Sequence, residues 1–539
     1  MSERITWGER LRYAFDKSMA AGPVALIGWL SLVTLLVIVV ASTVINAGGI
    51  APEGAEPLGY GEALWQSLMR TMDPGTMAGD FGWPFRIVAL LVTLAGIFVF
   101  SALIGILSSG ISDRLVELRK GRSRVLEQGH TIVLNWSPSI FDIISELAVA
   151  KDSESRPRLV VMANKDKVEM EDEIAAKVAD SGKLKIICRS GDPTDLYDLS
   201  LANPRTASSI IVLSPEGGDA DAQVVKTILA LVHDPRRRKA RYRIAAEIRS
   251  AKNAKIARIV GGGEVQLVLA DELIALIVAH SSRQSGLSAV YSELLSFSGG
   301  EIYTAPVGDL AGRTYGEALL AFDNGALIGL CDPQRRVKVN PAPDTVIAAG
   351  SLAIVVAEDD AAIRTAALPP GAIDEAAISA ARSAAAAPAR VLVLGWNHRG
   401  PMVIDELSAF LEAGAELTIA ADAADAGHAA AALAAARPGL IVTHRDADSS
   451  DRDVLLALDP ARYEQAVVLS DIDRLSAQAA DTKTLVTLLH LREIADDAGK
   501  RIGIVSEMAD LRNRELAEVT RADDFVVSNR LVSMMLAQA

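Results

Sequence analysis

The sequence predicts a multi-domain chain, in which an α-helical membrane domain with two spans precedes two tandem α/β Rossmann-like domains with doubly wound parallel sheets. Three observations predict this. The longest apolar runs of the 539 residues all lie before residue 112. Strand and helix patterns alternate from residue 130 onward, as in a parallel sheet covered by helices. The same strand motifs then recur roughly 260 residues later, which indicates an internal duplication.

The membrane prediction rests on two uncharged segments. Residues 24–46 hold no charged side chain, and residues 87–112 hold none between Arg86 and Asp113. A helix of about 20 apolar residues crosses a bilayer, so we expect helices over 24–46 and 84–112. The first run is longer than the apolar core of a signal peptide, and a second span follows it.

Charge flanking these segments predicts their orientation. Basic residues precede the first helix and follow the second, whereas the connecting segment is acidic, with Arg70 its one basic residue. By the positive-inside rule, both chain ends are expected in the cytoplasm. The basic residues are Arg4, Arg10, Arg12, Lys17, Arg114, Arg119, Lys120, Arg122 and Arg124.

The connecting segment distinguishes a pore from a simple anchor. Residues 60–72 read as an amphipathic helix too short to span, and residues 73–80 hold Pro and Gly that end it and leave extended backbone. Non-helical backbone is tolerated at membrane depth where it lines a water-filled path. The alternative is an exposed loop with a surface helix. The predicted filter residues are Thr71, Met72, Asp73, Pro74, Gly75, Thr76 and Asp80.

Small residues in the second span suit the wall of such a pore. Gly96 and Gly105 permit bending or close approach, and Ser101 and Ser108 offer hydroxyl groups. The same residues also suit ordinary helix packing, so both interpretations stay open.

The rest of the chain divides by pattern. We expect a cytosolic segment over 1–22, a pore domain over 23–112, a linker over 113–129 and a first Rossmann lobe over 130–285. A smaller lobe with short strands follows over 286–372, then an Ala-rich linker over 373–389 and a second Rossmann lobe over 390–539. In the second copy the smaller lobe is absent or the chain is truncated. Val391 to Asn397 parallels Ile132 to Trp136, and Glu507 and Asn513 repeat the spacing of Glu247 and Asn253.

Dinucleotide binding is not strongly indicated. The first copy has no glycine in the turn after its first strand. The second runs from Gly395 to Gly400 and has Asn397 where the fingerprint has the glycine that lets backbone approach a pyrophosphate. Asn164 and Asp166 in the first copy, or Asp422 in the second, could occupy the position of the ribose-binding acid. We therefore do not expect NAD as a cofactor.

Other chemistry is limited. Acidic clusters raise Ca²⁺ as a ligand, since it prefers several carboxylate oxygens, although each cluster also suits a solvated helix start. His280, His398 and His444 are isolated and no catalytic motif occurs, so the chain is not expected to be an enzyme. The net charge of −14 argues against general nucleic-acid binding, and two separated cysteines imply no disulfide framework. The candidate calcium ligands are Glu169, Glu171, Asp172, Glu173, Asp192 and Asp195.

Several motifs together resemble a known family. The turns at 135–136 and 395–397, the stretch from Cys188 to Pro193 and the segment from Asp73 to Met77 are similar to the bacterial branch of the Castor/Pollux ion channel family. The resemblance implies a homo-tetramer in a bacterial cell membrane, with RCK domains (regulators of potassium conductance) forming a gating ring and calcium as a ring ligand. Residues 72–77 match neither the Thr-Val-Gly-Tyr-Gly filter of potassium channels nor the Ala-Asp-Ala-Gly-Asn type of plant members. Selectivity among potassium, sodium and calcium therefore stays open.

The sequence thus predicts a ligand-gated cation channel subunit. Ligand binding would shift the packing of the Rossmann units, and the linker would pass this on as a pull on the pore-lining helix. The alternatives are a membrane-anchored NAD-dependent oxidoreductase and a non-conducting membrane sensor or transporter subunit.

Overall fold

The computed structural model describes residues 7, 13, 17, 23–54, 56–119, 121–152, 154–217, 219–297, 299–359, 363–366, 374–377, 388–510, 513, 516–517 and 522–539, with the backbone alone for 113–119 and 375. It forms two compact units, residues 1–121 and 122–539. The predicted segment 1–22 and the linker 373–389 lie largely outside the described residues.

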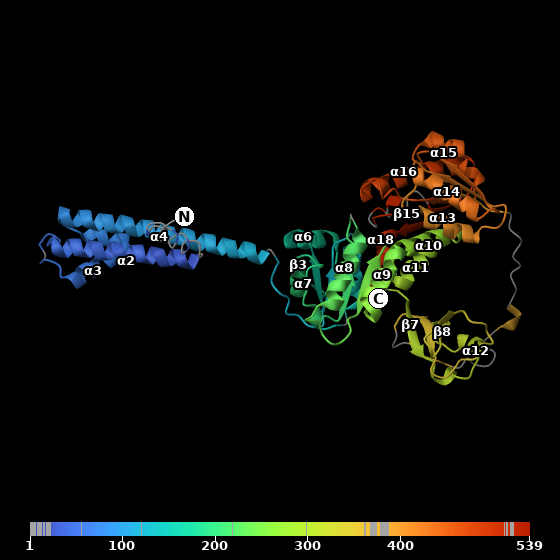
Figure 1. Ribbon diagram of the computed structural model, residues 1–539, viewed down its shortest axis with the longest axis horizontal. Coiled ribbons are helices and arrows are strands. Elements are labelled where there is room, and N and C mark those ends of the chain that lie inside the picture. Colours follow the sequence, from blue (N-terminus) through green and yellow to red (C-terminus); the bar gives the residue numbers. More distant parts are fainter. Residues whose placement is uncertain are drawn as a thin grey trace, which may run out of the picture. The chain divides into compact units, whose positions relative to one another are not determined.

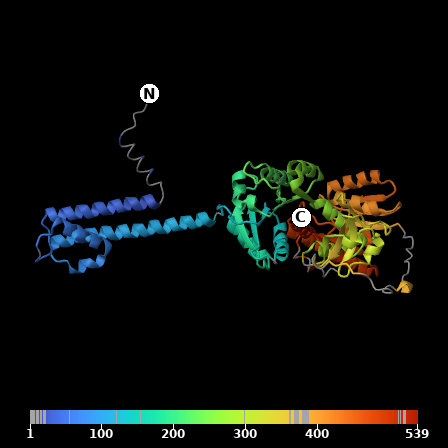
Figure 2. The ribbon, with the colours of Figure 1, turned by 90° about the horizontal axis from the view of Figure 1, so that it is seen from below.

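The first unit is a pair of long helices with a short helix folded between them. It contains α2 (Pro23–Ala47), α3 (Tyr60–Met72), the 3₁₀ turn η1 (Pro74–Gly79) and α4 (Trp83–Arg119). Helix α2 and the part of α4 from Trp83 to Ser112 each have a mean hydropathy of 2.8 and are long and apolar enough to cross a membrane. The two predicted spans are confirmed. Figures 1 and 2 show α2 and α4 side by side.

Helix α4 is longer than the sequence pattern indicated. It continues without interruption to Arg119, through the first part of the predicted linker 113–129. No Pro or Gly stands between Ser112 and Gly121, so this charged segment contains no residue that would end the helix. The helix therefore extends beyond the apolar span.

The first Rossmann copy has one parallel sheet of order β3-β2-β1-β4-β5-β6. Its buried strands are short apolar runs, as expected for a sheet covered on both faces. The strands are β1 (Thr131–Leu134), β2 (Arg158–Ala163), β3 (Lys185–Ser190), β4 (Ser209–Val212), β5 (Ile244–Ile248) and β6 (Val265–Leu269). The helices are α5 (Ser139–Ala150), α6 (Lys167–Lys177), α7 (Leu196–Leu199), α8 (Ala220–His233), α9 (Ala251–Gly261) and α10 (Ala270–Arg283).

The second copy repeats this topology in the order β13-β12-β11-β14-β15-β16. The strands are β11 (Arg390–Leu394), β12 (Glu416–Ala420), β13 (Ile441–Arg445), β14 (Gln465–Val468), β15 (Gly503–Met508) and β16 (Asp524–Val527). The helices are α13 (Gly400–Phe410), α14 (Ala424–Ala436), α15 (Arg452–Leu458), α16 (Ala477–Asp497) and α18 (Ser528–Gln538). The predicted duplication of doubly wound sheets is present.

Even the local backbone is duplicated. Asn135 and Gly395, which follow the first strand of each copy, have φ of 71° and 75°. The turns before the fourth strands match as well, with left-handed Asn203 and Asp459 each followed by proline. Left-handed backbone favours Gly, Asn and Asp, so both copies preserve the turn with different residues that tolerate it.

Between the copies lies the smaller lobe. It begins with α11 (Leu287–Leu295) and holds an antiparallel sheet of order β7-β10-β8-β9, with the short helix α12 (Tyr315–Leu319) against it. The strands are β7 (Glu301–Pro306), β8 (Ala326–Cys331), β9 (Val337–Val339) and β10 (Leu352–Ala357). The strands expected near residues 300–304 and 351–357 are therefore confirmed.

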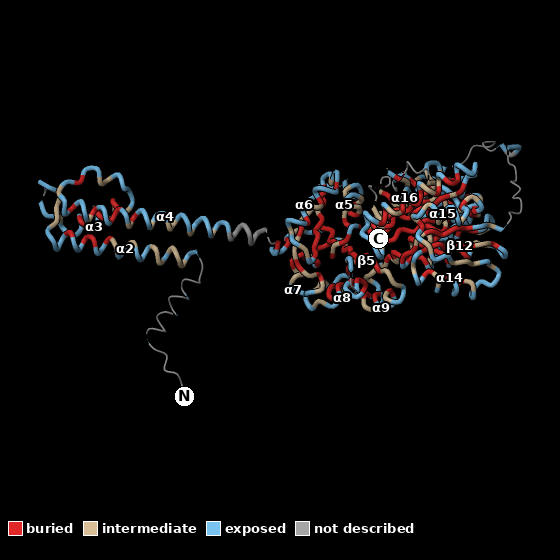
Figure 3. Tube along the Cα trace, turned by 90° about the horizontal axis from the view of Figure 1, so that it is seen from above, coloured by how far each residue is buried: buried red, intermediate tan, exposed pale blue. Residues whose placement is uncertain are grey.

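The two Rossmann copies exchange their last helices. Helix α10 leaves the first sheet and packs on α13 of the second copy, while α18 leaves the second sheet and packs on α5 of the first. One apolar cluster runs through both copies, including Ile144, Ile274 and Met534, and Figure 3 shows the buried segments in red along both sheets. Because each copy buries a helix of the other, they behave as one folded unit.

Candidate functional site

The helix–loop segment between the membrane helices is held by local hydrogen bonds. Asp73 ends α3 by donating its N–H to Met69 O at 2.8 Å, and its carboxylate accepts from Gly75 N at 2.8 Å. Thr76 Oγ1 donates to Asp73 O at 2.8 Å. With Pro74 at its first position, the segment folds into η1 rather than the extended backbone expected from the sequence.

The filter candidates fall into three groups in this protomer. Met72, Asp73, Pro74 and Gly75 are exposed, Thr71 and Thr76 are half-buried, and Asp80 is buried. Asp80 receives the Arg70 guanidinium in a bidentate ion pair, with Nε to Oδ2 at 3.0 Å. Asp80 is therefore a structural partner of Arg70 rather than a free carboxylate on the predicted pathway.

For Gly96 the structure favours the second of the two predicted interpretations, helix packing. A Cβ at this position would lie 2.4 Å from Thr71 O, so the glycine lets the end of α3 lie directly against α4. Gly96 is thus a packing residue between two helices of one chain. Ser42 and Ser67 make a similar close contact between α2 and α3, with their hydroxyls 3.4 Å apart.

The other small residues of α4 lie on an open face. Ser101, Gly105 and Ser108 are exposed in the protomer, and the spacing of four and three residues puts them on one side of the helix. An adjacent stripe of large apolar side chains, Phe100, Ile104 and Leu107, is also exposed. Helix α4 therefore presents a small and polar stripe beside a lipid-like one.

The predicted nucleotide residues do not form an open phosphate site. A Cβ at Gly400 would lie 2.7 Å from the ring of Trp396, which is buried over the start of α13 and donates from Nε1 to Asp425 Oδ2 at 2.9 Å. Asn397 Nδ2 donates to Ser470 O at 2.8 Å and to Glu507 Oε2 at 2.7 Å.

Gly395 and Asp422 complete this set. A Cβ at Gly395 would lie 2.5 Å from Leu469 O, so the glycine serves the crossing of two loops. Asp422 is exposed, with its carboxylate 3.7 Å from Arg474. Glycine and asparagine thus serve chain packing in the second copy, where the Trp396 indole lies against Gly400 at the start of α13.

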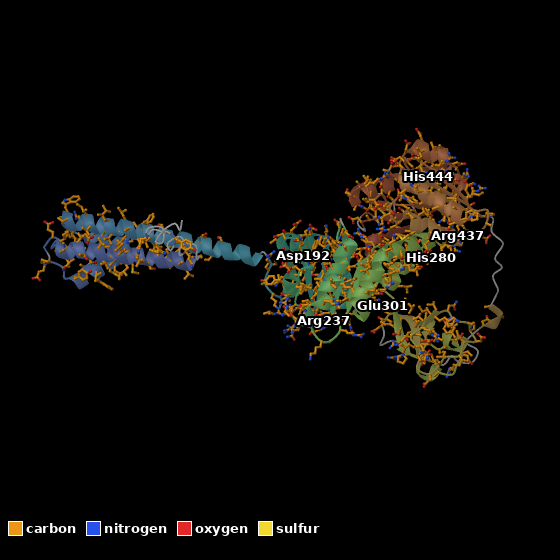
Figure 4. All side chains as sticks on the ribbon, viewed as in Figure 1. Asp192, Arg237, His280, Glu301, Arg437 and His444 are labelled. Carbon is orange, nitrogen blue, oxygen red and sulfur yellow. The ribbon has the colours of Figure 1, made fainter. Side chains whose placement is uncertain are left out.

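The acidic residues proposed for calcium are mostly engaged with cations or with turns. Glu169 and Glu173 pair with Lys165 at 3.2 and 2.7 Å, and Glu171 pairs with Lys167. Asp195 caps α7, and Asp192, labelled in Figure 4, accepts from Thr194 at 2.8 Å; Asp172 is exposed. Within the described residues, no three His, Cys, Asp or Glu side chains converge as a metal site.

A polar cavity of about 540 Å³ lies where the two Rossmann copies meet. It opens at the carboxyl ends of β1, β4 and β5, which is where ligands bind in doubly wound sheets. The Ser137 and Ser214 hydroxyls line it, are buried and have no hydrogen-bond partner. Charged groups from both copies line the same cavity: Glu216, Glu247, Arg249, Asp271, His398, Arg399 and Asp473.

Buried charges join the copies across this cavity. Arg399 of the second copy donates from Nε to Asp271 Oδ1 of the first copy at 2.9 Å and also pairs with Glu507. His398 bridges Asp271 at 3.1 Å and Asp473 at 2.5 Å. Hydrogen bonds that the His398 ring donates to Asp271 and then to Asp473 raise the pKa of His398 to about 9, whereas burial raises the pKa of Glu247 to about 7.

A repeated carboxylate was not identified from the sequence. Asp221 accepts from Arg249 N, Ser250 N and Asn253 Nδ2 at 2.8–3.0 Å. Asp481 accepts from Ala509 N, Asp510 N and Asn513 Nδ2 over the same distances. The signal was available, because Asp221 and Asp481 stand at the spacing already noted for Asn253 and Asn513.

The histidines noted as isolated are packed individually. His280, labelled in Figure 4, lies edge-on to Phe410 at 5.1 Å, across the contact of α10 with the second copy. His444 is labelled there too and has a buried Nε2 without a partner. Only His398 joins a charged network.

The fold and the features described above place this chain in a class of proteins, the two-span membrane proteins that carry tandem RCK-type Rossmann domains. Residues 271–371, from α10 to beyond β10, match the family described as Castor and Pollux, part of voltage-gated ion channel. Over these residues the chain is similar to the Castor/Pollux family.

Curated relatives match along the whole chain. Two are named as CASTOR channels, a probable ion channel of Oryza sativa subsp. japonica (29% identical, 99% of this chain and 63% of the relative) and an ion channel of Lotus japonicus (28%, 100% and 66%). A probable ion channel POLLUX of Arabidopsis thaliana is 29% identical over 99% of this chain and 68% of the relative. The chain thus spans about two thirds of their length. Their names agree with the prediction that it is not an enzyme.

The chain is also similar to solved structures of a gating ring and of a channel. The human SLO3 gating ring superposes with a TM-score of 0.50 at 13% identity, over 76% of this chain and 81% of that one. The GsuK channel bound to NAD has a TM-score of 0.46 at 14% identity, over 95% and 83%. The SLO3 likeness confirms the predicted RCK fold.

Proposed function

We propose that this chain is one subunit of a homo-tetrameric cation channel whose paired RCK domains form a ring that opens and closes the pore. The observation that carries this proposal is the short helix α3 and exposed loop 72–75 folded between two membrane helices. An anchor requires neither. The names of the relatives support the same function.

The permeation path would lie between subunits. The exposed residues 72–75 would face it from the loop, and the stripe of Ser101, Gly105 and Ser108 would face it from α4. Asp73 brings a carboxylate to each subunit, so a tetramer would carry a ring of negative charge that favours cations. The large side chains beside the stripe would face lipid or a neighbouring subunit.

Assembly of the ring is supported by a duplicated apolar surface. Leu229 on α8 and Ile256 on α9 are 45% and 51% exposed, and the matching positions of the second copy, Leu489 and Leu516, are 49% and 62% exposed. Isolated exposed leucines need no explanation, but the same pair in both copies does. Each copy would offer this surface to a copy in the next subunit.

Gating would use the contact between the Rossmann copies. The polar cavity lies against the ion pairs that join them, so a ligand there would favour one packing of the copies over another. Helix α4 extends past the apolar span to Arg119, and the first copy follows it directly in sequence, so movement of the ring would act on this helix through the short connection. Basic flanks favour cytoplasmic ends, and a bacterial cell membrane is the proposed location. Calcium remains a proposed ligand.

The test is cation flux through vesicles that contain the purified full-length chain. Asp73→Asn removes the charge but leaves an oxygen that can still cap η1, so the variant should fold and conduct less. Glu62→Gln, which removes an exposed carboxylate from α3, serves as the control and should keep the flux. Absence of flux for every cation and ligand tried would contradict a channel.

A further inference from the structure

Arg70 and Asp80 form a buried ion pair in the first unit, where the other described charged side chains are exposed. Arg70 lies in the last turn of α3 and Asp80 directly follows η1, and their side chains are only 7% and 6% exposed. The guanidinium donates from Nε to Asp80 Oδ2 at 3.0 Å, and its Nη2 pairs with Oδ1. This bidentate geometry fixes direction as well as distance.

The remaining donors of Arg70 are also used. Its Nη1 donates to Gln66 O at 3.0 Å and to Gln66 Oε1 at 2.6 Å, and the guanidinium lies over the Phe85 ring at 4.9 Å. Phe85 is buried beside Ile45 and Ala63. The arginine is therefore seated on the small apolar core of the unit and has little freedom to move.

Asp80 is fixed through its backbone as well. Its N–H donates to Met77 O at 3.1 Å, and its carbonyl accepts from Arg86 Nε at 2.7 Å. Asp80 thus joins the end of α3, through its carboxylate, to the start of α4, through its carbonyl. Residues 71–79, which comprise the end of α3, Asp73 and η1, form a segment whose two ends are tied together by this pair.

A buried ion pair is a costly way to obtain stability. Desolvation of both charges offsets most of their attraction, and a well-packed apolar pair would serve equally well. Charged groups within membrane segments are correspondingly rare and mark function. The pair instead fixes the conformation of the segment between its two partners. That segment contains the exposed filter candidates, which are therefore positioned by the pair.

We propose that Arg70 and Asp80 are positioning residues that hold the ion-selecting loop in shape, so that cation selectivity depends on their pairing. The inference rests on the proposed channel function. Neither side chain contacts the ion; both act through the backbone of residues 71–79. Selective binding sites require their groups to be held within about 0.5 Å, which a tied loop provides and a loose one does not.

The first experiment measures the potassium-to-sodium permeability ratio of the full-length protein in planar bilayers. Arg70→Lys and Asp80→Glu keep each charge but lose the bidentate geometry, and each should change the ratio at least about threefold. Arg70→Gln, Asp80→Asn and the double variant should each change it as well, because the pair is lost in all three. Glu62→Gln should leave it unchanged. Conducting Arg70→Gln and Asp80→Asn channels with the wild-type ratio would overturn the proposal.

A second readout does not depend on current. Cys188 and Cys331 are buried, so a cysteine placed at half-buried Thr76 would be the reactive thiol of the protein towards a charged methanethiosulfonate. Adding Arg70→Lys to Thr76→Cys should change its modification rate at least about fivefold, because the loop is no longer held. An unchanged rate would overturn the inference. A silent wild-type protein would instead contradict the channel function, while the thiol still reports on the loop.

Discussion

Arg399 in the second Rossmann copy donates to Asp271 in the first copy at 2.9 Å, and both side chains are at least nine-tenths buried. The same guanidinium pairs with Glu507 of its own copy. One arginine therefore neutralises a carboxylate from each half of the ring domain. Any change in the packing of the copies must either carry this network along or break it, which makes the network the natural place to test coupling between them.

Arg399→Gln should destabilise the contact between the copies. Removing one partner of a buried ion pair leaves an uncompensated charge and costs about 3–5 kcal/mol. Chemical denaturation of the full-length protein in detergent measures this loss. Arg452→Gln is the matched control, because its pair with Glu493 is 41% and 52% exposed, is screened by solvent and should contribute little to stability. Equal losses for the two variants would contradict the interdomain role of Arg399.

His398 predicts a dependence of stability on alkaline pH. Its pKa is raised to about 9 because Asp271 and then Asp473 accept hydrogen bonds from the charged ring. The unfolded chain has the ordinary value of 6.5, so the stabilisation is complete below pH 6.5 and is lost as the pH rises through 9.

The unfolding temperature should therefore fall between pH 7 and 9.5 more steeply in the wild type than in His398→Gln. Glu247 titrates near pH 7 and adds to the change mainly below this window. His428→Gln removes an exposed histidine of α14 and should keep the wild-type slope. Identical slopes in wild type and His398→Gln would show that the bridge is not formed.

Gly96→Ala should disturb the seat of the short helix. The added methyl would lie 2.4 Å from Thr71 O, and backbone cannot move aside as a side chain can. Overpacking of this kind costs about 1–3 kcal/mol, visible as a lower unfolding temperature of the membrane protein in detergent. Gly28→Ala on α2 meets no atom within 4 Å and provides the control. If both variants are equally stable, α3 does not lie against α4 as described.

The duplicated apolar surface predicts the effect of charge on assembly. Leu229→Glu and Leu489→Glu each place a carboxylate on the surface proposed to join subunits, and the double variant should lower the mass of the oligomer measured by light scattering. Leu320→Glu, an equally exposed position in the smaller lobe, should not. An unchanged mass in the double variant would place the assembly surface elsewhere.

Much of the architecture could be predicted from local patterns of charged and apolar residues along the sequence. Uncharged runs predict membrane helices because charged side chains are costly in the lipid core. Buried parallel strands are short and apolar because helices cover both faces of their sheet. The duplication was visible in the sequence because Glu507 and Asn513 repeat the spacing of Glu247 and Asn253. Helix bounds were less accurate, since α4 continues past its apolar part to Arg119.

The individual roles of polar residues were harder to predict. Asp80 and Asp73 look alike in sequence, and only the folded unit shows that Arg70 reaches the first and leaves the second exposed. Gly96 resembled a pore-wall residue until Thr71 was seen against it. His398 appeared isolated because its partners lie 127 and 75 residues away in the chain. Tertiary contacts decide such roles, and sequence spacing does not report them.

The most direct test of the account is the reversal potential of currents from the purified full-length protein in a planar bilayer with a salt gradient. We expect unitary currents that reverse at the equilibrium potential of the cation, with a smaller unitary current in Asp73→Asn. Silent bilayers, or currents that reverse at the anion potential, would contradict the central claim that this chain forms a cation channel.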